Sequence, residues 1–218
     1  MATWADVVVK QNQLIRKALD AAVFLAPLTA DVPTTIVDAA GGPALPVGFM
    51  PLGNLSGDGI TWAREVETSG ITSLGSVEPT RSDIRSVTNT VQLTAQETNR
   101  LTIESTLNVD LSTLVPKVGG EVTFEEPNRP KSKYYRLLGL AVDDGDAGEI
   151  YIGRLMPRVK MTETGDQVWS DGDDGMVREM TFQSFKDAEA GFSARHFFGG
   201  PGWAALLADM GFLPAATT

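Results

Sequence analysis

The sequence predicts a mainly β (α+β) fold that combines antiparallel strands with one helix and extended arms. Its 218 residues include 22 glycines and 12 prolines, and this composition, rich also in Thr, Ser and Val, favours short strands over a helical bundle. The stretch 86–95 alternates apolar and hydroxyl-bearing side chains, with Asn89 the exception, which is typical of a strand with one polar face. Three later apolar stretches are joined by acidic turns, as in an antiparallel meander.

Residues 1–46 are expected to form an N-terminal arm that contains the first strand. The apolar run 23–26 predicts that strand, and Pro27 ends it. The following stretch, up to residue 46, is rich in Pro, Thr, Ala and Gly and indicates an extended loop. Arg16 precedes an apolar stretch that resembles a signal peptide, but Asp20 interrupts it, which favours retained structure. No apolar run reaches the roughly 20 residues that cross a bilayer.

Residues 47–200 are expected to form the β-rich body. Short strands are predicted at 49–55 and 60–67, and the turn-rich segment 68–85 is predicted to be a hairpin tip or long loop, exposed and available to a neighbour. Thr94 and Glu97 have the spacing of a capping box, which predicts a helix near 95–107. The alternation of apolar residues over 101–107 would also suit a strand.

The second half is expected to hold the meander and a C-terminal helical segment. Strands are predicted at 134–142, 149–161 and 176–186, joined by the acidic turns 143–146 and 171–175. Residues 201–218 carry an apolar pattern at helical spacing that ends at Gly211. We expect three of these apolar residues to anchor the segment on its own or a neighbouring subunit: Trp203, Leu206 and Leu207.

The sequence contains no motif that is typical of an enzyme. The formal net charge of −10 argues against a surface that grips phosphates, and the absence of cysteine excludes disulfides and thiolate sites. His196 is the only histidine and has no nucleophile pattern around it. The turns ending at Gly145 and Gly175 fail the calcium-loop spacing, which leaves only irregular ion binding open. Glu65 and Glu67 are better explained as an exposed strand face than as a glycosidase pair. We therefore expect no catalytic, cofactor or metal site.

Five phrases follow one another in a fixed order between residues 14 and 203: LIRKALDAAVFLAP, GFMPLGNLSGDGITW, SVEPTRSDI, LTAQETNRLTIE and FGGPGW. Together they resemble the major tail tube protein of long-tailed, siphovirus-type bacteriophages, particularly those of actinobacteria. Residues 115–135 carry none of this resemblance.

The resemblance implies the phage tail tube fold: an antiparallel β-sandwich or barrel with one flanking helix, a long hairpin loop and terminal arms. It implies a structural virion protein that polymerises as stacked hexameric rings into the tail tube, the conduit for DNA delivery into the host. The implied partners are further copies of itself and the tape measure, tail terminator and tail-tip proteins. Genomic DNA would pass through the lumen without specific binding, and assembly would take place in the host cytoplasm.

Two sets of residues are expected to serve this assembly. The long, turn-rich segment after residue 67 predicts inter-ring contacts by Thr68, Ser69, Ile71, Leu74, Glu78 and Arg81. Segment 143–175 holds nine acidic and three basic residues, 3 − 9 = −6, more than half of the net charge. Its turns supply candidates for the lumen or the ring faces: Asp143, Asp144, Asp146, Glu149, Asp171, Asp173 and Asp174. The alternative is that these turns only keep the protein soluble.

Two other functions remain open on the sequence alone. Another virion ring protein, such as a tail terminator, connector or decoration protein, would also be acidic and β-rich. A carbohydrate- or cell-binding β-sandwich module would need an exposed aromatic platform, and only three tyrosines and four tryptophans are available. Trp62, Trp169 and Trp203 are expected instead to be core or interface anchors.

Overall fold

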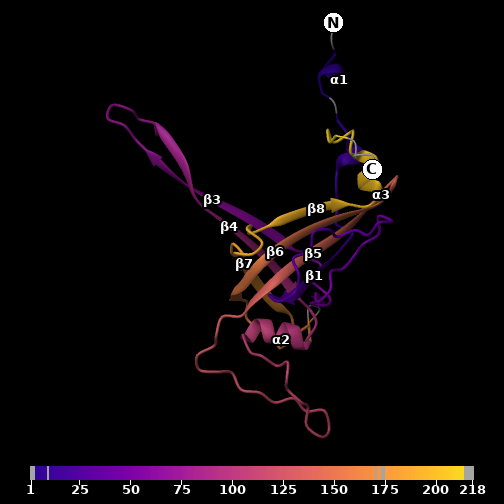
Figure 1. Ribbon diagram of the computed structural model, residues 1–218, viewed down its shortest axis with the longest axis vertical. Helices are drawn as coiled ribbons and strands as arrows, with labels where there is room; N and C mark the ends of the chain where they lie inside the picture. The colour runs from indigo at the N-terminus through magenta and orange to yellow at the C-terminus, as the bar shows by residue number, and fades with distance from the viewer. Residues whose placement is uncertain (1–2, 9, 170, 173–174, 214–218) are drawn as a thin grey trace.

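The strands form one eight-stranded antiparallel sheet that does not close on itself (Figure 1). The structure is a computed structural model that describes residues 3–8, 10–169, 171–172 and 175–213. The strands are β1 (Asp20–Pro27), β2 (Met50–Pro51), β3 (Thr61–Ile71), β4 (Arg81–Ala95), β5 (Tyr134–Gly145), β6 (Gly148–Thr164), β7 (Arg178–Ser184) and β8 (Arg195–Gly199). The helices are α1 (Trp4–Val7), α2 (Arg100–Leu107) and α3 (Pro201–Leu206), with a 3-10 turn at Asn12–Leu14.

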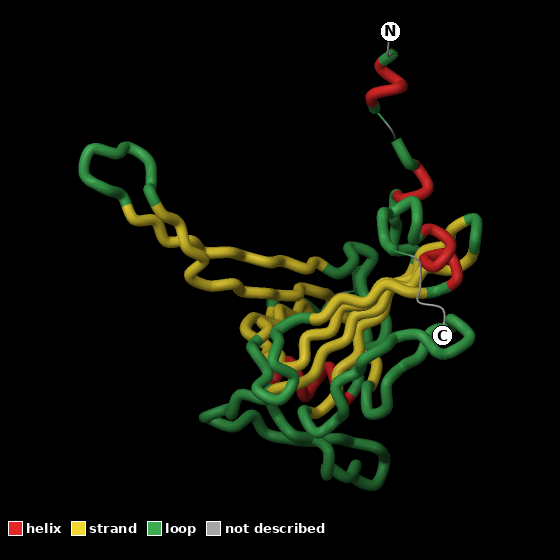
Figure 2. Tube along the Cα trace, turned by 45° about the horizontal axis from the view of Figure 1, so that its top comes forward, coloured by secondary structure: helices red, strands yellow, loops and turns green. Residues whose placement is uncertain are grey.

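The sheet divides at β6, which is the longest strand. Its order is β2-β1-β5-β6-β7-β4-β3, and β8 pairs with β6 outside this path. Strand β5 accompanies β6 on one edge, whereas the other edge pairs first with β8, from Tyr151 to Leu155, and then with β7, from Val159 to Thr164. The sheet therefore continues from β6 as two branches, one formed by β5, β1 and β2 and the other by β7, β4 and β3 (Figure 2).

The main core lies between the two branches and is closed at one end by α2. Side chains on alternate positions of the strands point inward, and the largest buried ones include Phe182, Leu137 and Met156. A second apolar cluster lies on the opposite face of β5 and β6, where Ile36 and Phe49 of the β1–β2 connection cover it. The predicted mainly β fold with a flanking helix is thus confirmed.

The predicted capping box at Thr94 and Glu97 is wrong, although the helix itself lies within the predicted range. Strand β4 continues to Ala95 because Leu55 bridges to it, and α2 starts only at Arg100. Its cap is Asn99, whose side chain accepts from the Thr102 amide at 3.0 Å, while the Thr102 hydroxyl accepts from the Asn99 amide at 3.0 Å. The alternative reading of 101–107 as a strand is also wrong.

Glu97 has a different partner, in the turn after β2. Its carboxylate accepts a hydrogen bond from the Asn54 amide at 2.8 Å. The neighbouring Gly53 has a φ of +94°, and a Cβ there would lie 2.2 Å from the Glu97 carboxyl. Together with the bridge between Leu55 and Ala95, this contact connects the segment after β2 to the end of β4. The two branches of the sheet therefore meet at the α2 end.

The remaining strand predictions differ from the structure mainly in length. The strands predicted at 23–26, 60–67, 134–142, 149–161 and 176–186 are present as β1, β3, β5, β6 and β7. The strand predicted at 49–55 shrinks to Met50–Pro51, and β8 was not predicted. The segment 68–85 is the outer part of a hairpin, in which the ends of β3 and β4 are paired and residues 72–80 form the tip, rather than an unpaired loop.

Arg136 joins two turns to the body through a buried ionic contact. It stands opposite the two residues Pro157 and Arg158 in a bulge between β5 and β6. Its guanidinium donates to the carbonyls of Leu28, Ala30 and Pro157 at 2.7–3.0 Å and pairs with Asp187 at 3.4 Å. Each guanidinium nitrogen of Arg136 therefore has a hydrogen-bond acceptor, as a buried charge requires.

The two branches of the sheet touch where Gly139 of β5 packs against Trp62 of β3, and a substitution at Gly139 tests this contact. A Cβ at Gly139 would lie 2.4 Å from the indole, so Gly139→Ala must displace the ring or the strand. We expect the variant to lose about 1–3 kcal/mol of unfolding free energy in urea titrations followed by circular dichroism. Adding Trp62→Leu makes room and should recover part of the loss, and fully additive losses would contradict this packing.

Asp187 is expected to make stability depend on acidic pH. The backbone amides of Ala190 and Glu189, with the Arg136 charge, lower the pKa of this carboxyl below its ordinary 3.8. The ionised carboxylate therefore adds stability above pH 3.8, and this contribution disappears as the pH falls through the lowered pKa. In urea titrations, the difference between wild type and Asp187→Asn should be large at pH 6 and shrink towards pH 3. A difference that is constant with pH would refute the assignment.

Candidate functional site

The hairpin formed by β3 and β4 leaves the body and projects into solvent (Figures 1 and 2). Every residue from 64 to 87 is exposed apart from Ser76. A two-stranded ribbon has little stability of its own in water. Its length and exposure leave a surface that is available to another molecule.

One face of the ribbon, called the apolar face below, carries exposed apolar side chains next to Arg64 and Asn89, and the other face is polar. Val66 lies opposite Val87, and beyond a bulge Ile84 lies opposite Thr68, so these side chains continue the face that is buried lower down. The other face carries carboxylates and hydroxyls, including the hydrogen bond from Ser86 to Glu67 at 2.9 Å. The apolar face is exposed like one half of a sandwich without its second layer.

The predicted inter-ring residues are all on this hairpin. Thr68, Ser69 and Ile71 belong to β3, Arg81 begins β4, and Leu74 and Glu78 lie in the tip, residues 72–80. The tip is held by bonds from the Thr80 amide to the Ile71 carbonyl and between the Ser73 and Thr80 hydroxyls, each 2.8 Å long. Leu74 and Val77 are fully exposed, at 107% and 100%.

A polar face covers the outside of the sheet formed by β6, β7, β4 and β3. The strand register places hydroxyl and amide side chains opposite one another, for example Gln92 opposite Thr61 and Thr181. The face comprises Thr61, Ala63, Glu65, Glu67, Ser86, Thr88, Thr90, Gln92, Thr94, Arg158, Lys160, Glu163, Glu179, Thr181 and Gln183. Two are basic and four acidic, so its charge is 2 − 4 = −2.

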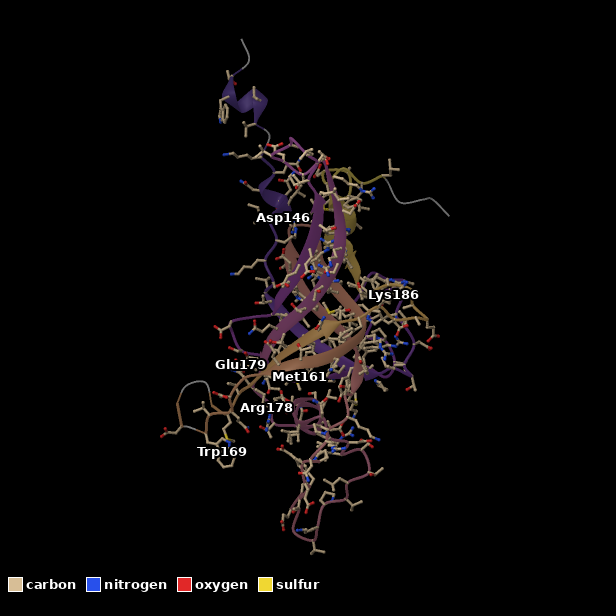
Figure 3. The ribbon with its side chains drawn as sticks, turned by 90° about the vertical axis from the view of Figure 1, so that its left-hand side faces the viewer. Asp146, Met161, Trp169, Arg178, Glu179 and Lys186 are labelled. Carbon is tan, nitrogen blue, oxygen red and sulfur yellow. The ribbon has the colours of Figure 1, made fainter. Side chains whose placement is uncertain are left out.

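The predicted acidic residues do not gather at one place. Asp143 is buried and accepts from Arg16 at 3.2 Å and from the Lys17 amide at 3.3 Å. Asp144, Asp146 and Glu149 are exposed around the β5–β6 turn, where Glu149 accepts from the Tyr151 hydroxyl, and Asp171 is exposed in the β6–β7 connection. Figure 3 shows Asp146 far from Trp169, which lies two residues before the acidic turn 171–175. Asp173 and Asp174 lie outside the described residues.

The predicted C-terminal anchor packs on its own chain. The Trp203 ring of α3 stacks on Phe198 of β8 with centroids 4.8 Å apart, and Phe212 lies 6.1 Å from it. Leu206 and Leu207 are half-buried. His196 is exposed on β8 opposite Arg154, and partial burial together with the Arg154 charge lowers its pKa. The described residues contain no group of three or more His, Cys, Asp and Glu that could hold a metal ion.

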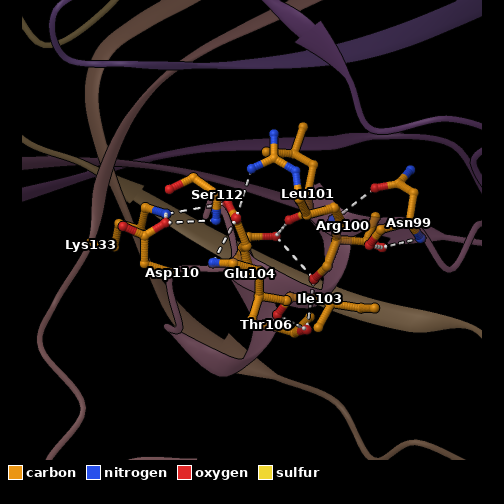
Figure 4. A network of polar contacts seen from close by, with 12 residues as sticks. Asn99, Arg100, Leu101, Ile103, Glu104, Thr106, Asp110, Ser112 and Lys133 are labelled. Atoms are coloured by element: carbon orange, nitrogen blue, oxygen red, sulfur yellow. Dashed lines mark hydrogen bonds and ion pairs between the residues drawn. The ribbon is translucent and has the colours of Figure 1, made fainter. Parts of the chain in front are cut away.

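A network around buried Glu104 holds both ends of the long β-free segment 108–133 (Figure 4). Its Oε1 accepts from Arg100 at 3.0 Å and from the Leu111 amide at 2.9 Å, and its Oε2 pairs with Lys133 at 3.3 Å. Lys133 also lies 3.8 Å from Asp110. One carboxylate of α2 thus fixes the start and the end of the segment.

An open pocket of about 540 Å³ lies beside this network. Its walls are apolar side chains from the ends of β1 and β2 and from α2, and its rim carries the charged groups of the Glu104 network. Tyr135 lines it, is 4% exposed, and its hydroxyl has no hydrogen-bond partner. Burial, with the Glu104 and Asp110 charges, raises the pKa of Tyr135. Sequence reasoning missed this pocket.

Replacing Glu104 tests the network. Glu104→Gln removes the charge that pairs with Arg100 and Lys133, and we expect a loss of about 1–3 kcal/mol in urea titrations, with faster tryptic cleavage at Lys131. Glu121→Gln is the matched control, because its pair with Lys117 is exposed and should leave stability and cleavage unchanged. Equal behaviour of the two variants would show that Glu104 does not hold the segment.

None of the helices in the described part of the chain has the length and hydrophobicity that a bilayer span requires. No curated protein matches the chain. Three solved structures are similar at 11% identity. A chain in the tail of an empty GTA particle with C6 symmetry aligns with 79% of this chain and 96% of its own, at a TM-score of 0.39.

The other two structures come from the anti-feeding prophage. A chain of its 6-fold symmetrised baseplate aligns with 81% of this chain and 91% of its own, at a TM-score of 0.41. A chain of its tube-terminating cap aligns with 90% of this chain and 99% of its own, at a TM-score of 0.38. The family model described as phage tail tube protein matches residues 9–191, which is 183 of the 218 residues. The chain therefore belongs to the phage tail tube protein family.

Proposed function

We propose that this protein polymerises as stacked hexameric rings into a phage tail tube of the siphovirus type, the conduit for DNA delivery into the host. The observation that carries the proposal is the hairpin, whose residues 64–87 project from the body with an uncovered apolar face. A monomer gains nothing from such a ribbon, whereas a neighbouring copy can bury it. The subunit number of six follows from the family resemblance.

Open sheet edges support ring formation. Among the described residues, β3 pairs only with β4, so its outer edge offers unpaired backbone groups. In a ring, the edge of one subunit can pair with the next, and closure removes all such edges. The polar face of β6, β7, β4 and β3 would then line the lumen.

The charge of this face suits a DNA conduit. Its hydroxyl and amide groups are hydrated, and its net charge of −2 offers no basic track for phosphates. DNA would therefore pass without specific binding. The acidic residues of the two turns, apart from buried Asp143, are proposed to lie at the lumen or the ring faces.

The other parts of the chain have proposed roles in assembly. Residues 1–46 and 201–218 would flank the body, 47–200, as segments that contact neighbours, and the hairpin would contact the adjacent ring. The tape measure, tail terminator and tail-tip proteins are the proposed further partners. The protein would act in the virion tail after assembly in the host cytoplasm, with a structural rather than an enzymatic role.

Electron microscopy of the purified protein over a concentration series tests this function. We expect stacked rings or hollow tubes from the wild type. The matched variant replaces residues 68–85 by Asn-Gly, because Glu67 and Ser86 face each other and a two-residue turn can join them. It should keep its circular dichroism spectrum and form rings without tubes.

Two results would contradict the proposal. Discrete single rings from the wild type would favour a terminator or connector. Normal tubes from the shortened variant would show that the hairpin does not join the rings. Val47→Ser, a change at a 93% exposed residue outside the hairpin, is the control for non-specific effects on assembly.

A further inference from the structure

We infer that the pocket beside α2 receives the hairpin tip, residues 72–80, of a subunit in the next ring. The inference rests on the proposed function, since it names the surface that the hairpin contacts. It is carried by the chemistry of the tip and by the position and apolar lining of the pocket.

The tip presents two apolar side chains in an ordered turn. Leu74 and Val77 have their full surface in water. The turn is internally bonded, because the Ser76 hydroxyl donates to the Glu78 carbonyl at 2.8 Å and the Ser76 amide donates to the Ser73 carbonyl at 3.0 Å. A pre-formed turn loses little conformational freedom on binding, so burial of these side chains converts efficiently into affinity.

The tip and the pocket lie at opposite ends of the molecule. In Figure 1 the hairpin rises from the upper side of the body, whereas α2 and segment 108–133 lie at the lower end, and Figure 3 shows the same separation. Identical subunits that stack along this direction make a head-to-tail contact, in which the upper end of one copy meets the lower end of the next. The pocket is therefore within the region that a projecting tip would meet.

The pocket has the surface that such a tip needs. Leu25, Pro27, Leu28 and Leu101 form apolar walls, and Met50 at the mouth is 40% exposed. Its volume of about 540 Å³ lies within the roughly 300–1,000 Å³ of typical ligand pockets. Leu74 and Val77 could therefore both enter it.

The charges at the rim are balanced and are compatible with the hairpin tip. The rim carries Arg100 and Lys133 together with the carboxylates Glu104 and Asp110, so its charge is 2 − 2 = 0. The side chains of the two cations remain 48% and 33% exposed, and Glu78 of the tip can pair with one of them. The N-terminal arm is already held on its own subunit, where Arg16 pairs with Asp143 at 3.2 Å.

Cysteine cross-linking tests the contact directly, because the chain contains no cysteine. The double variant Val77→Cys with Met50→Cys is assembled and oxidised, and a ladder of covalent multimers is expected on non-reducing gels. The matched control joins Val77→Cys with Asp146→Cys, which is exposed in the β5–β6 turn, away from α2 and its pocket. The control and each single variant should give no ladder.

The outcomes separate the two proposals. Tubes with no ladder, or with an equal ladder in the control, would overturn the assignment of the pocket and leave the tube intact. A wild type that forms no tubes or stacked rings would overturn the proposed function itself.

A second measurement applies if the cysteine variants fail to assemble. Val77→Ser and Met50→Ser should each raise the protein concentration needed for tubes by about tenfold. The double variant should raise it little further, because both changes remove the same contact. If the double variant raised this concentration by the product of the two single effects, the pairing of Val77 with Met50 would be refuted.

Discussion

The fold depends on the pairing of β6 along both edges. Because β5 follows one edge while β8 and β7 share the other, the two branches of the sheet must diverge from this one strand. The change from β8 to β7 occurs near a bulge at Pro157, a residue that cannot donate to a ladder and is tolerated where pairing is interrupted. The bulge also turns Arg136 towards the outer face, where it holds the turns after β1 and β7. One irregularity in the ladder thus fixes the core, the branching and two surface turns.

The same geometry explains why the hairpin is uncovered. Near the body, the inner face of β3 packs on β5 through Trp62 and Gly139, so the two branches enclose a core. Farther out the branches have separated, yet the alternation of the strands continues through Val66 and Val87. The ribbon keeps an inward-facing apolar stripe where the subunit has no second layer to cover it. In the proposed assembly, burial of that stripe by another copy would complete the sandwich.

Local patterns in the sequence predicted those parts of the fold that depend on local chemistry. The alternation over 86–95 correctly predicted β4, because each strand face is defined by its own residues. The start of α2 could not be placed in the same way, since the predicted cap residues have long-range partners: Thr94 still belongs to β4, and the Glu97 carboxylate accepts from the Asn54 amide. Strand β8 is short and exists only through its pairing with β6.

The candidate sites show the same division between local and long-range information. Exposure of the hairpin was predictable from its turn residues and weak apolar pattern. The burial of Asp143 was not, because its partner Arg16 is 127 positions away. The Glu104 network was also hidden, since Lys133 joins it only after a long irregular segment that carries no family resemblance. A pocket assembled from four distant stretches leaves no pattern in any one of them.

The distribution of charge completes the physical account of the proposed conduit. The chain carries a net charge of −10, but the polar sheet face accounts for only −2 of it. Most of the acidic excess therefore lies outside the wall that would face DNA. Threonine and glutamine suit such a wall for two reasons: threonine favours strands, and both side chains hold water without attracting phosphates. Since electrostatic forces are screened within about 8–10 Å, acidic groups beyond the wall contribute little to the passage of DNA. At the proposed ring faces, repulsion between like charges would limit how rings approach and would leave the specific contacts to set the stacking.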